Sequence, residues 1–440
     1  YVQLFTHIYQ LKLIPPTGYD DKYVLSGSIR WDRSNLWGTN SKYQNKPLWS
    51  VGGSWNIYKE KFFQADFVDM LKLRASYGIG GNIGRNTAPY LIASYYDSSL
   101  VDGMAGSVNT PPNKDIRWEK TTTVNVGVDF ALFRHRLSGT IEYYNKYSVD
   151  LLAAINGSPT QGFGYTTLMT NNGKMVNRGV EITLSGEIIR QKDFSWNASL
   201  LYAFNRNKVK HISVQPSLWD SRISMPTSYP MVGKPLYGIY AYKWAGLNEN
   251  GDPQVYDAEN NVTSGPARDY HALVYCGTTV PIHNASLTNV LRYKGFEFSA
   301  MLILDAGHKL RSSNIPSINM SNGRITSTAK GIVDRWTQPG DVTDVPRLLF
   351  SNDTENFNTH RTELYRYSDL FVYDASNIRL SNISLAYRVP AHWCKKISLS
   401  GARLQFNVEN VATFAFDSKA NYDLGGKVKP NYVWGLYLNF

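Results

Sequence analysis

The sequence contains little cysteine, little charge and no long apolar run. Its two cysteines, Cys276 and Cys394, lie far apart, which excludes a disulfide framework and a cysteine metal site. No stretch of about 18 uninterrupted apolar residues occurs, so no transmembrane helix is predicted. Charged residues occupy 18% of the 440 positions, below the usual quarter. No signal-peptide pattern opens the chain, so an exported protein would have to be mature or truncated.

Patterns typical of enzymes are also missing. The eight histidines are scattered, and neither H-E-x-x-H nor G-x-S-x-G occurs. The segment 248–262 is rich in Asn, Asp and Glu but lacks the ligand spacing of a calcium loop. We therefore predict no catalytic residue, no metal site, no cofactor and no enzyme activity. The formal net charge is +11, but Lys and Arg are spread singly, so nucleic acid is not an expected partner.

What the sequence does contain is alternation with a period of two residues, the period of a β-strand. The segment 123–130 is one example, and similar segments recur through most of the chain. Its apolar positions are Val124, Val126, Val128 and Phe130. Such a pattern arises in a β-sandwich, where one face is core and one is water, or in a membrane barrel, where one face is lipid and one is a polar lumen.

Three features favour the barrel. The strands are about 10 or more residues long, as a tilted span requires. Aromatic residues gather near the ends of the apolar rows, as in an interfacial girdle. The polar rows carry charges of both signs, which suits a wet interior. The residues that we expect to face the lumen are Asp129, Glu142, Glu181, Arg403 and Glu409.

The lengths of the connections support the same interpretation. Short links alternate with long polar segments at about 80–116, 152–175, 208–283 and 309–371, as in an outer-membrane barrel with periplasmic turns and extracellular loops. This places Cys394 in a short turn and Cys276 in a long loop. About thirteen strands are predicted, within one domain over 1–440. An odd number with an open edge cannot close, so we expect the C-terminal part of a larger barrel. A further strand at 236–244 would change that parity.

Several segments resemble SusC-like TonB-dependent outer-membrane transporters of Bacteroidota. These are LKLRASYG at 71–78, WEKTTTVNVGVD at 118–129, NRGVEITL at 177–184 and PLYGIYAYKWAG at 235–246. The resemblance implies an all-β transmembrane antiparallel barrel of 22 strands, with an N-terminal plug and a TonB-interacting segment ahead of it. It also implies a SusD-like surface lipoprotein as a lid. We expect the plug, the TonB segment and the remaining strands to lie upstream of this chain.

The resemblance implies TonB-dependent import of a bulky nutrient, a glycan or an oligopeptide, by an integral protein of the Gram-negative outer membrane. Two alternatives stay open: a passive porin, and a surface adhesin or lectin. The long loops contain aromatic residues that either pack the loops together or contact a substrate or the lid. These candidates are Trp219, Tyr229, Tyr237, Tyr240, Tyr242, Trp244 and Trp336.

The chain ends on an alternating apolar row. Its members are Tyr432, Trp434, Leu436, Leu438 and Phe440. We expect this row to face lipid on the closing strand. A terminal aromatic of this kind also resembles the signal that the barrel-assembly machinery recognises in outer-membrane proteins. This interpretation makes Phe440 a true terminus and Tyr1 an internal one.

Overall fold

The computed structural model describes residues 6–11, 17–34, 38, 40, 47–82, 89–99, 103–157, 160, 167–216, 221–265, 269–320, 328–350, 359–396, 398–424 and 429–440. Trp219 lies outside these residues. Within them no helix has the length and apolar character to cross a membrane.

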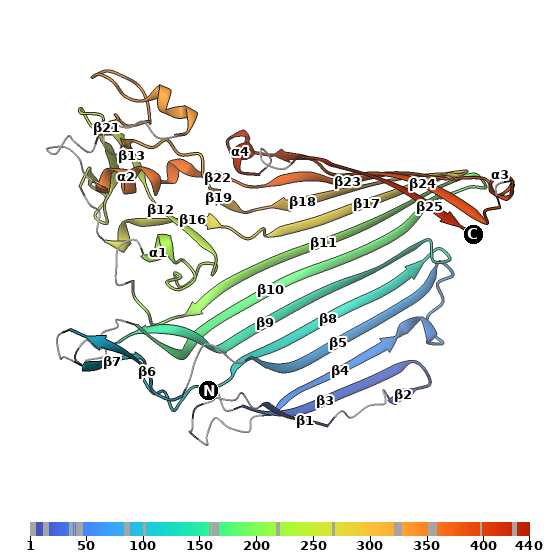
Figure 1. The fold of residues 1–440 in the computed structure, drawn as a ribbon. Helices are drawn as coiled ribbons and strands as arrows, with labels where there is room; N and C mark the ends of the chain where they lie inside the picture. Colours follow the sequence, from blue (N-terminus) through green and yellow to red (C-terminus); the bar gives the residue numbers. More distant parts are fainter. Residues whose placement is uncertain are drawn as a thin grey trace.

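One large antiparallel sheet dominates the fold, and thirteen of its strands follow a single path in chain order (Figure 1). They are β1 (Thr6–Leu11), β3 (Tyr23–Ser34), β4 (Leu48–Asn56), β5 (Val68–Asn82), β8 (Glu119–Leu132), β9 (Leu137–Asn156), β10 (Thr167–Arg190), β11 (Phe194–His211), β17 (His283–Tyr293), β18 (Phe296–Ala306), β23 (Asn377–Arg388), β24 (Gly401–Ala415) and β25 (Asn431–Asn439). A short strand, β2 (Thr17–Tyr19), pairs beside β3. The all-β fold and the count of about thirteen are confirmed.

Strand register puts the apolar residues on one face and the polar residues on the other. Val126 lies opposite Tyr143 on one side and Ala75 on the other, while Gly127 lies opposite Glu142 and Arg74. Because neighbouring strands stay in step, each row continues across the sheet. Many apolar side chains of the first face are exposed, among them Ile141, Leu385 and Leu404. An exposed apolar face of this extent is what lipid would cover.

Short turns and long connections lie at opposite ends of the sheet. The turns at 133–136, 191–193 and 294–295 share one end with the segment 389–400, which contains α3 (Ala391–Lys395) (Figure 1). The long connections 212–282 and 307–376 leave from the other end. The predicted alternation is therefore present. Cys276 lies in β16 (Leu273–Thr278), at the long-connection end, and Cys394 lies in α3.

The described parts of the two connections 212–282 and 307–376 fold together into one unit, which we call the loop body. It contains α1 (Ser221–Ser224), β12 (Gly238–Tyr242), β13 (Trp244–Leu247), β14 (Pro253–Tyr256), β15 (Val262–Thr263), β16, β19 (Lys309–Arg311), β20 (Asn319–Met320), β21 (Leu349–Phe350), α2 (Thr359–Arg366) and β22 (Val372–Asp374). Its core joins residues of both connections, such as Tyr240, Val255 and Leu364. The segment 236–244 contains β12, which pairs with β16 outside the main sheet, and ends at the first residue of β13.

Strand pairing extends further than the sequence indicated. The glycine-rich run GIGGNIG at 78–84 predicts a turn after the strand, but β5 continues to Asn82 and pairs with β8. A side chain at Gly81 would meet the Trp118 ring at 2.8 Å, so glycine here lets that ring lie against the strand. In the expected loop 152–175, β9 continues to Asn156 and β10 begins at Thr167. A separate hairpin, β6 (Ile92–Ser98) and β7 (Gly103–Thr110), occupies the connection after β5.

The last strand, β25, pairs with β24 along one edge, and its other edge has no strand partner among the described residues. Its alternating row is highly exposed, with Trp434 at 78% and Phe440 at 92%. Within the row Trp434 packs on Phe406 of β24, with ring centroids 4.2 Å apart. This geometry fits the lipid-facing position predicted for the row. Its use as an assembly signal stays a prediction.

Candidate transport wall and loop body

The five charged residues predicted to face the lumen share the polar face of the sheet. Glu142 of β9 lies directly opposite Glu181 of β10 and, on its other side, opposite Gly127 of β8. Asp129 is two residues after Gly127 on β8 and therefore lies on the same face. Arg403 and Glu409 occupy the same face of β24, where Glu409 lies opposite Asn382. These residues therefore lie along one wall rather than in one pocket. Its role as a transport lumen is a proposal, developed below.

Arg74 organises the first charged group on this wall. Its Nε lies 3.1 Å from the Asp129 carboxylate, and its Nη2 donates to Glu142. The Thr140 hydroxyl donates to Asp129 at 3.1 Å. Gly127 makes room for the guanidinium, because a Cβ there would lie 3.0 Å from the Arg74 guanidinium carbon. One cation thus bridges two carboxylates on neighbouring strands, and the three charges stay partly exposed.

A second charged group lies near the short-turn end of the wall. Glu297 accepts from Arg292 at 2.8 Å and from Arg403 at 3.1 Å. Nearer the loop body, Asp305 accepts from Asn284 at 2.7 Å and from Arg379 at 3.2 Å. Cations and carboxylates thus alternate along the wall as ion pairs. A polar surface of balanced charge stays hydrated without holding any one charged solute tightly.

Three of the six aromatic candidates within the described residues are packed inside the loop body. Tyr240 and Tyr242 are each 1% exposed and lie in its core, and Tyr229 is buried as well. The expectation that these three contact a substrate or a lid does not fit this burial, because none offers an open ring face. The alternative weighed for them, packing of the loops, is what the structure shows.

The remaining candidates differ in exposure. Trp244 is half-buried, and its ring lies tilted at 56° to that of Tyr365, with centroids 5.9 Å apart. Its Nε1 donates to Asp344 at 2.9 Å. Trp336 covers the turn at Gly251, whose φ of +74° and lack of a side chain admit the indole. Tyr237, directly before β12, is 46% exposed, so a ligand or a lid could reach its ring.

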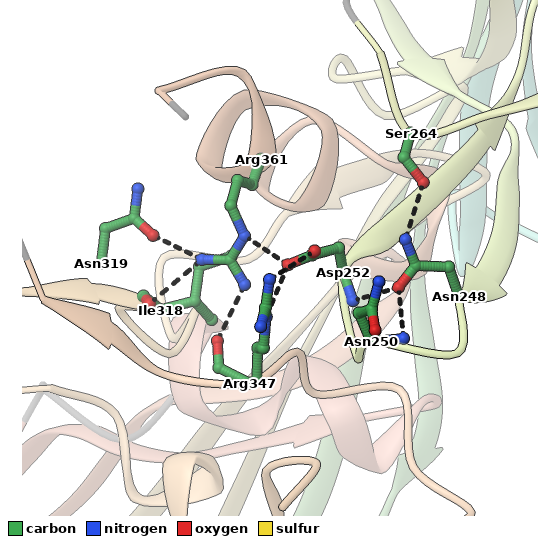
Figure 2. Close-up of polar contacts among 8 residues, drawn as sticks. All are labelled: Asn248, Asn250, Asp252, Ser264, Ile318, Asn319, Arg347 and Arg361. Atoms are coloured by element: carbon green, nitrogen blue, oxygen red, sulfur yellow. Dashed lines mark hydrogen bonds and ion pairs between the residues drawn. The ribbon is translucent and has the colours of Figure 1, made fainter. Parts of the chain in front are cut away.

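A partly buried polar network holds the two connections of the loop body together (Figure 2). Asp252 lies at the centre and accepts from Arg347 at 2.8 and 3.1 Å and from Arg361 at 2.8 Å. Arg361 is 4% exposed and also donates to Asn319 at 2.6 Å and to the Arg347 carbonyl at 2.9 Å. Burial lowers the pKa of the Arg361 guanidinium, and Asp252 opposes that shift.

The sequence did not single out these residues. Asp252 belongs to the segment 248–262, whose content of Asn, Asp and Glu without calcium-loop spacing predicts an ordinary turn-rich loop. Its turns are present, because the Asn248 carboxamide oxygen accepts from the Asn250 and Asp252 amides. The partners of Asp252 lie about a hundred positions further on, so no local pattern indicates them. Arg311 is a similar case, since it donates to the carbonyls of Tyr240, Arg366 and Ser368.

Cys276 and Asp374 of the loop body have strongly shifted pKa values. Burial raises the pKa of the Cys276 thiol to about 11. Burial would also raise the pKa of Asp374, but hydrogen bonds from Ser376 and the ammonium of Lys309, 3.0 Å away, lower it to about 2. Among the described residues no group of three or more His, Cys, Asp or Glu could hold a metal ion. Ion pairs and packed rings join the parts of the loop body.

Known proteins of similar sequence and structure agree with this geometry. The family described as TonB dependent receptor-like, beta-barrel, matches residues 9–411. TonB-dependent receptor P3 of Formosa agariphila is 27% identical over 95% of this chain and 42% of its own length. SusC of Bacteroides thetaiotaomicron is 25% identical over 89% of this chain and 39% of its own length.

The chain thus spans about two fifths of the length of these relatives. A solved structure of the RagAB peptide transporter has the same fold, with a TM-score of 0.76 at 23% identity over 96% of this chain and 46% of that one. The resemblance to SusC-like receptors is confirmed, and so is the location in the outer membrane. The chain belongs to the β-barrel family of TonB-dependent receptors.

Proposed function

We propose that this chain forms the C-terminal wall and part of the extracellular face of a transporter that imports a bulky nutrient, a glycan or an oligopeptide. Import would be driven by TonB acting on a plug, and a SusD-like lipoprotein would cover the mouth. The plug and the remaining strands would be supplied by sequence outside this chain. The protein would act as a transporter and not as an enzyme.

One observation carries the proposal. A sheet with an apolar outward face and an ion-paired polar inward face ends, at its long-connection end only, in a folded loop body. A solute collected by the loop body would move along the polar wall without crossing lipid. Tyr237, with its exposed ring, is the aromatic candidate best placed for a substrate or the lid. Asp129, Glu142, Glu181, Arg403 and Glu409 would keep the wall hydrated.

The names of the relatives support this reading. TonB-dependent receptors are named among the matches, and RagAB is called a peptide transporter. A passive porin would share the sheet but would need no TonB. An adhesin or lectin would bind its ligand with the loop body alone, so the ion-paired polar face of the sheet would have no function in it.

The test uses the complete gene in its native host. Deleting the gene should abolish growth on either an oligosaccharide mixture or an oligopeptide mixture as sole nutrient, and the complete gene should restore it. Loss of TonB should give the same defect. Growth that survives TonB loss but not gene deletion would indicate a passive porin. Normal growth of the deletion strain on both mixtures would favour an adhesin and overturn import.

A further inference from the structure

A cleft lined by cations lies where β10 and β11 meet the loop body. Its volume is about 600 Å³. Five of its lining residues are basic and none is acidic. The basic residues are Arg178, Arg206, Lys208, Lys210 and Lys234.

The strand register shows which face of the sheet carries this cleft. On β11 the outward apolar row runs from Phe194 through Tyr202 to Phe204, and the next residue of the same row is Arg206. On β10 the outward residue Val180 lies opposite Phe204, and Arg178 lies opposite Arg206. Both strands therefore change from apolar to cationic at the same height, on the face that lipid covers.

The position along the strands at which the outward side chains change from apolar to cationic matches the edge of the hydrocarbon layer of a bilayer. Phe194 and Phe204 are ten residues apart, which is about 34 Å along a strand. At a tilt of about 40° this becomes roughly 26 Å, close to the apolar band of outer-membrane barrels at about 25 Å. The ring of Phe204 contacts His283, and their centroids lie 5.3 Å apart, as in an interfacial girdle. Arg206 then lies at the level of the lipid headgroups.

The cations of the cleft have no carboxylate partners among the described residues. Arg178 donates to the neutral carboxamide of Asn145 at 2.9 Å, and the Lys234 ammonium lies 4.9 Å from the centre of the Tyr275 ring. Two arginines directly opposite each other on paired strands repel. Other arginines on the sheet do have acidic partners, among them Arg74, Arg292 and Arg379. A bound anion from outside the chain would therefore stabilise the positive charge of this cleft.

We propose that the cleft binds the phosphate-bearing headgroup of a glycolipid in the outward-facing leaflet of the membrane. Arginine fits phosphate with two parallel hydrogen bonds, and Lys208 and Lys210 add charge above it. The lipid chains would lie along the apolar row below Phe204. This site would fix the barrel in its leaflet and steady the loop body next to it, independently of import.

The test measures lipid binding by the complete, detergent-solubilised protein. The probes are lipid A carrying phosphate, the same lipid without phosphate, and inorganic phosphate, each followed by native mass spectrometry or by a titration. The wild-type protein should bind the phosphorylated lipid in preference to the other two. Equal binding of the two lipids would overturn the proposal, and so would equally tight binding of inorganic phosphate, which would indicate a free-anion site.

The variant R206Q/K208Q changes two exposed residues. It should bind the phosphorylated lipid about 30-fold more weakly, which corresponds to about 1 kcal/mol for each cation near a membrane surface. The matched control is K395Q/K396Q, which removes two exposed cations at the short-turn end and should bind as the wild type does. Unchanged lipid binding by R206Q/K208Q, with loss of a co-purifying protein, would make the cleft a protein-docking surface and overturn the proposal. The comparison of the two lipids on the wild-type protein needs no variant to fold.

Discussion

Arg361 of α2 and Asp252, which precedes β14, are 109 residues apart in the chain, yet the Arg361 Nε donates to the Asp252 carboxylate at 2.8 Å. Asp252 belongs to the connection after β11, and Arg361 belongs to the connection after β18. Their contact, reinforced by Arg347, makes a single unit of two loops that leave the barrel separately.

Replacing Arg361 should therefore loosen the loop body and leave the sheet intact. For Arg361→Met we expect the stability of the loop body to fall by about 2–3 kcal/mol, because the buried hydrogen bonds of a charged group are lost. Arg347 would still hold Asp252. Hydrogen exchange of peptides covering β14 and α2 should become faster, with no change in β9 or β10. Arg366→Met, on the exposed side of α2, is the matched control. Equal hydrogen-exchange rates of the β14 and α2 peptides in Arg361→Met and Arg366→Met would contradict this role of Arg361.

The Arg74 group should show measurable but modest coupling. In a double-mutant cycle with Arg74→Met and Asp129→Asn, we expect an interaction of about 1 kcal/mol, because both groups are partly exposed to water. The free energy of unfolding would be measured by urea titration in lipid vesicles. The interaction should shrink in about 1 M salt, where charges are screened beyond about 3 Å. A coupling of zero at low salt would show that Arg74 is not held by Asp129.

The ion pair of Asp374 and Lys309 predicts a pH dependence at the base of the loop body. The pKa of Asp374 is lowered from 3.8 to about 2, so its contribution to stability is complete above pH 3.8 and is lost as the pH falls towards 2. Pulsed hydrogen exchange of β19 and β22 after incubation at each pH should show this loss. Asp374→Asn should abolish the dependence. A transition that persists in the variant would assign it to another group.

The Cys276 thiol should react slowly in the folded protein. Its pKa of about 11 lies two units above the ordinary value of 9.0, so near pH 8 the thiolate is about 100-fold less populated. Alkylation by iodoacetamide, followed by mass spectrometry in a Cys394→Ser background, should be slower than in urea-unfolded protein by at least that factor. Similar rates in the two states would show that the thiol is exposed to water.

The sheet could be predicted from the sequence because its pattern is local. Each outward row, such as Val124 to Phe130, alternates within one strand, and antiparallel neighbours joined by short turns repeat it. The charges that share the polar face of the sheet could be grouped by the same parity. Where glycines interrupt the pattern, as at Gly78 and Gly81, the sequence wrongly indicated a turn. The requirement for glycine there comes from Ser50 of β4 and from Trp118, which directly precedes β8.

The loop body could not be predicted in the same way. Tyr240 and Tyr242 look exposed in a sequence rich in turns, but they are buried against Leu273 and Leu364, which come from other parts of the loops. The Asp252 network likewise depends on contacts between two connections. Packing of this kind is decided by tertiary contacts and not by periodicity.

The union of two loops by Asp252 has a consequence for anyone who engineers this surface. Suppose that only the connection after β11 is replaced by that of a relative. If the new connection has no carboxylate at the position of Asp252, Arg347 and Arg361 lose their ion-pair partner. The two connections would have to be exchanged as a pair, with the β17–β18 hairpin between them. Natural recombination faces the same restriction, so new binding properties at this face would be inherited as one block running from about residue 212 to residue 376.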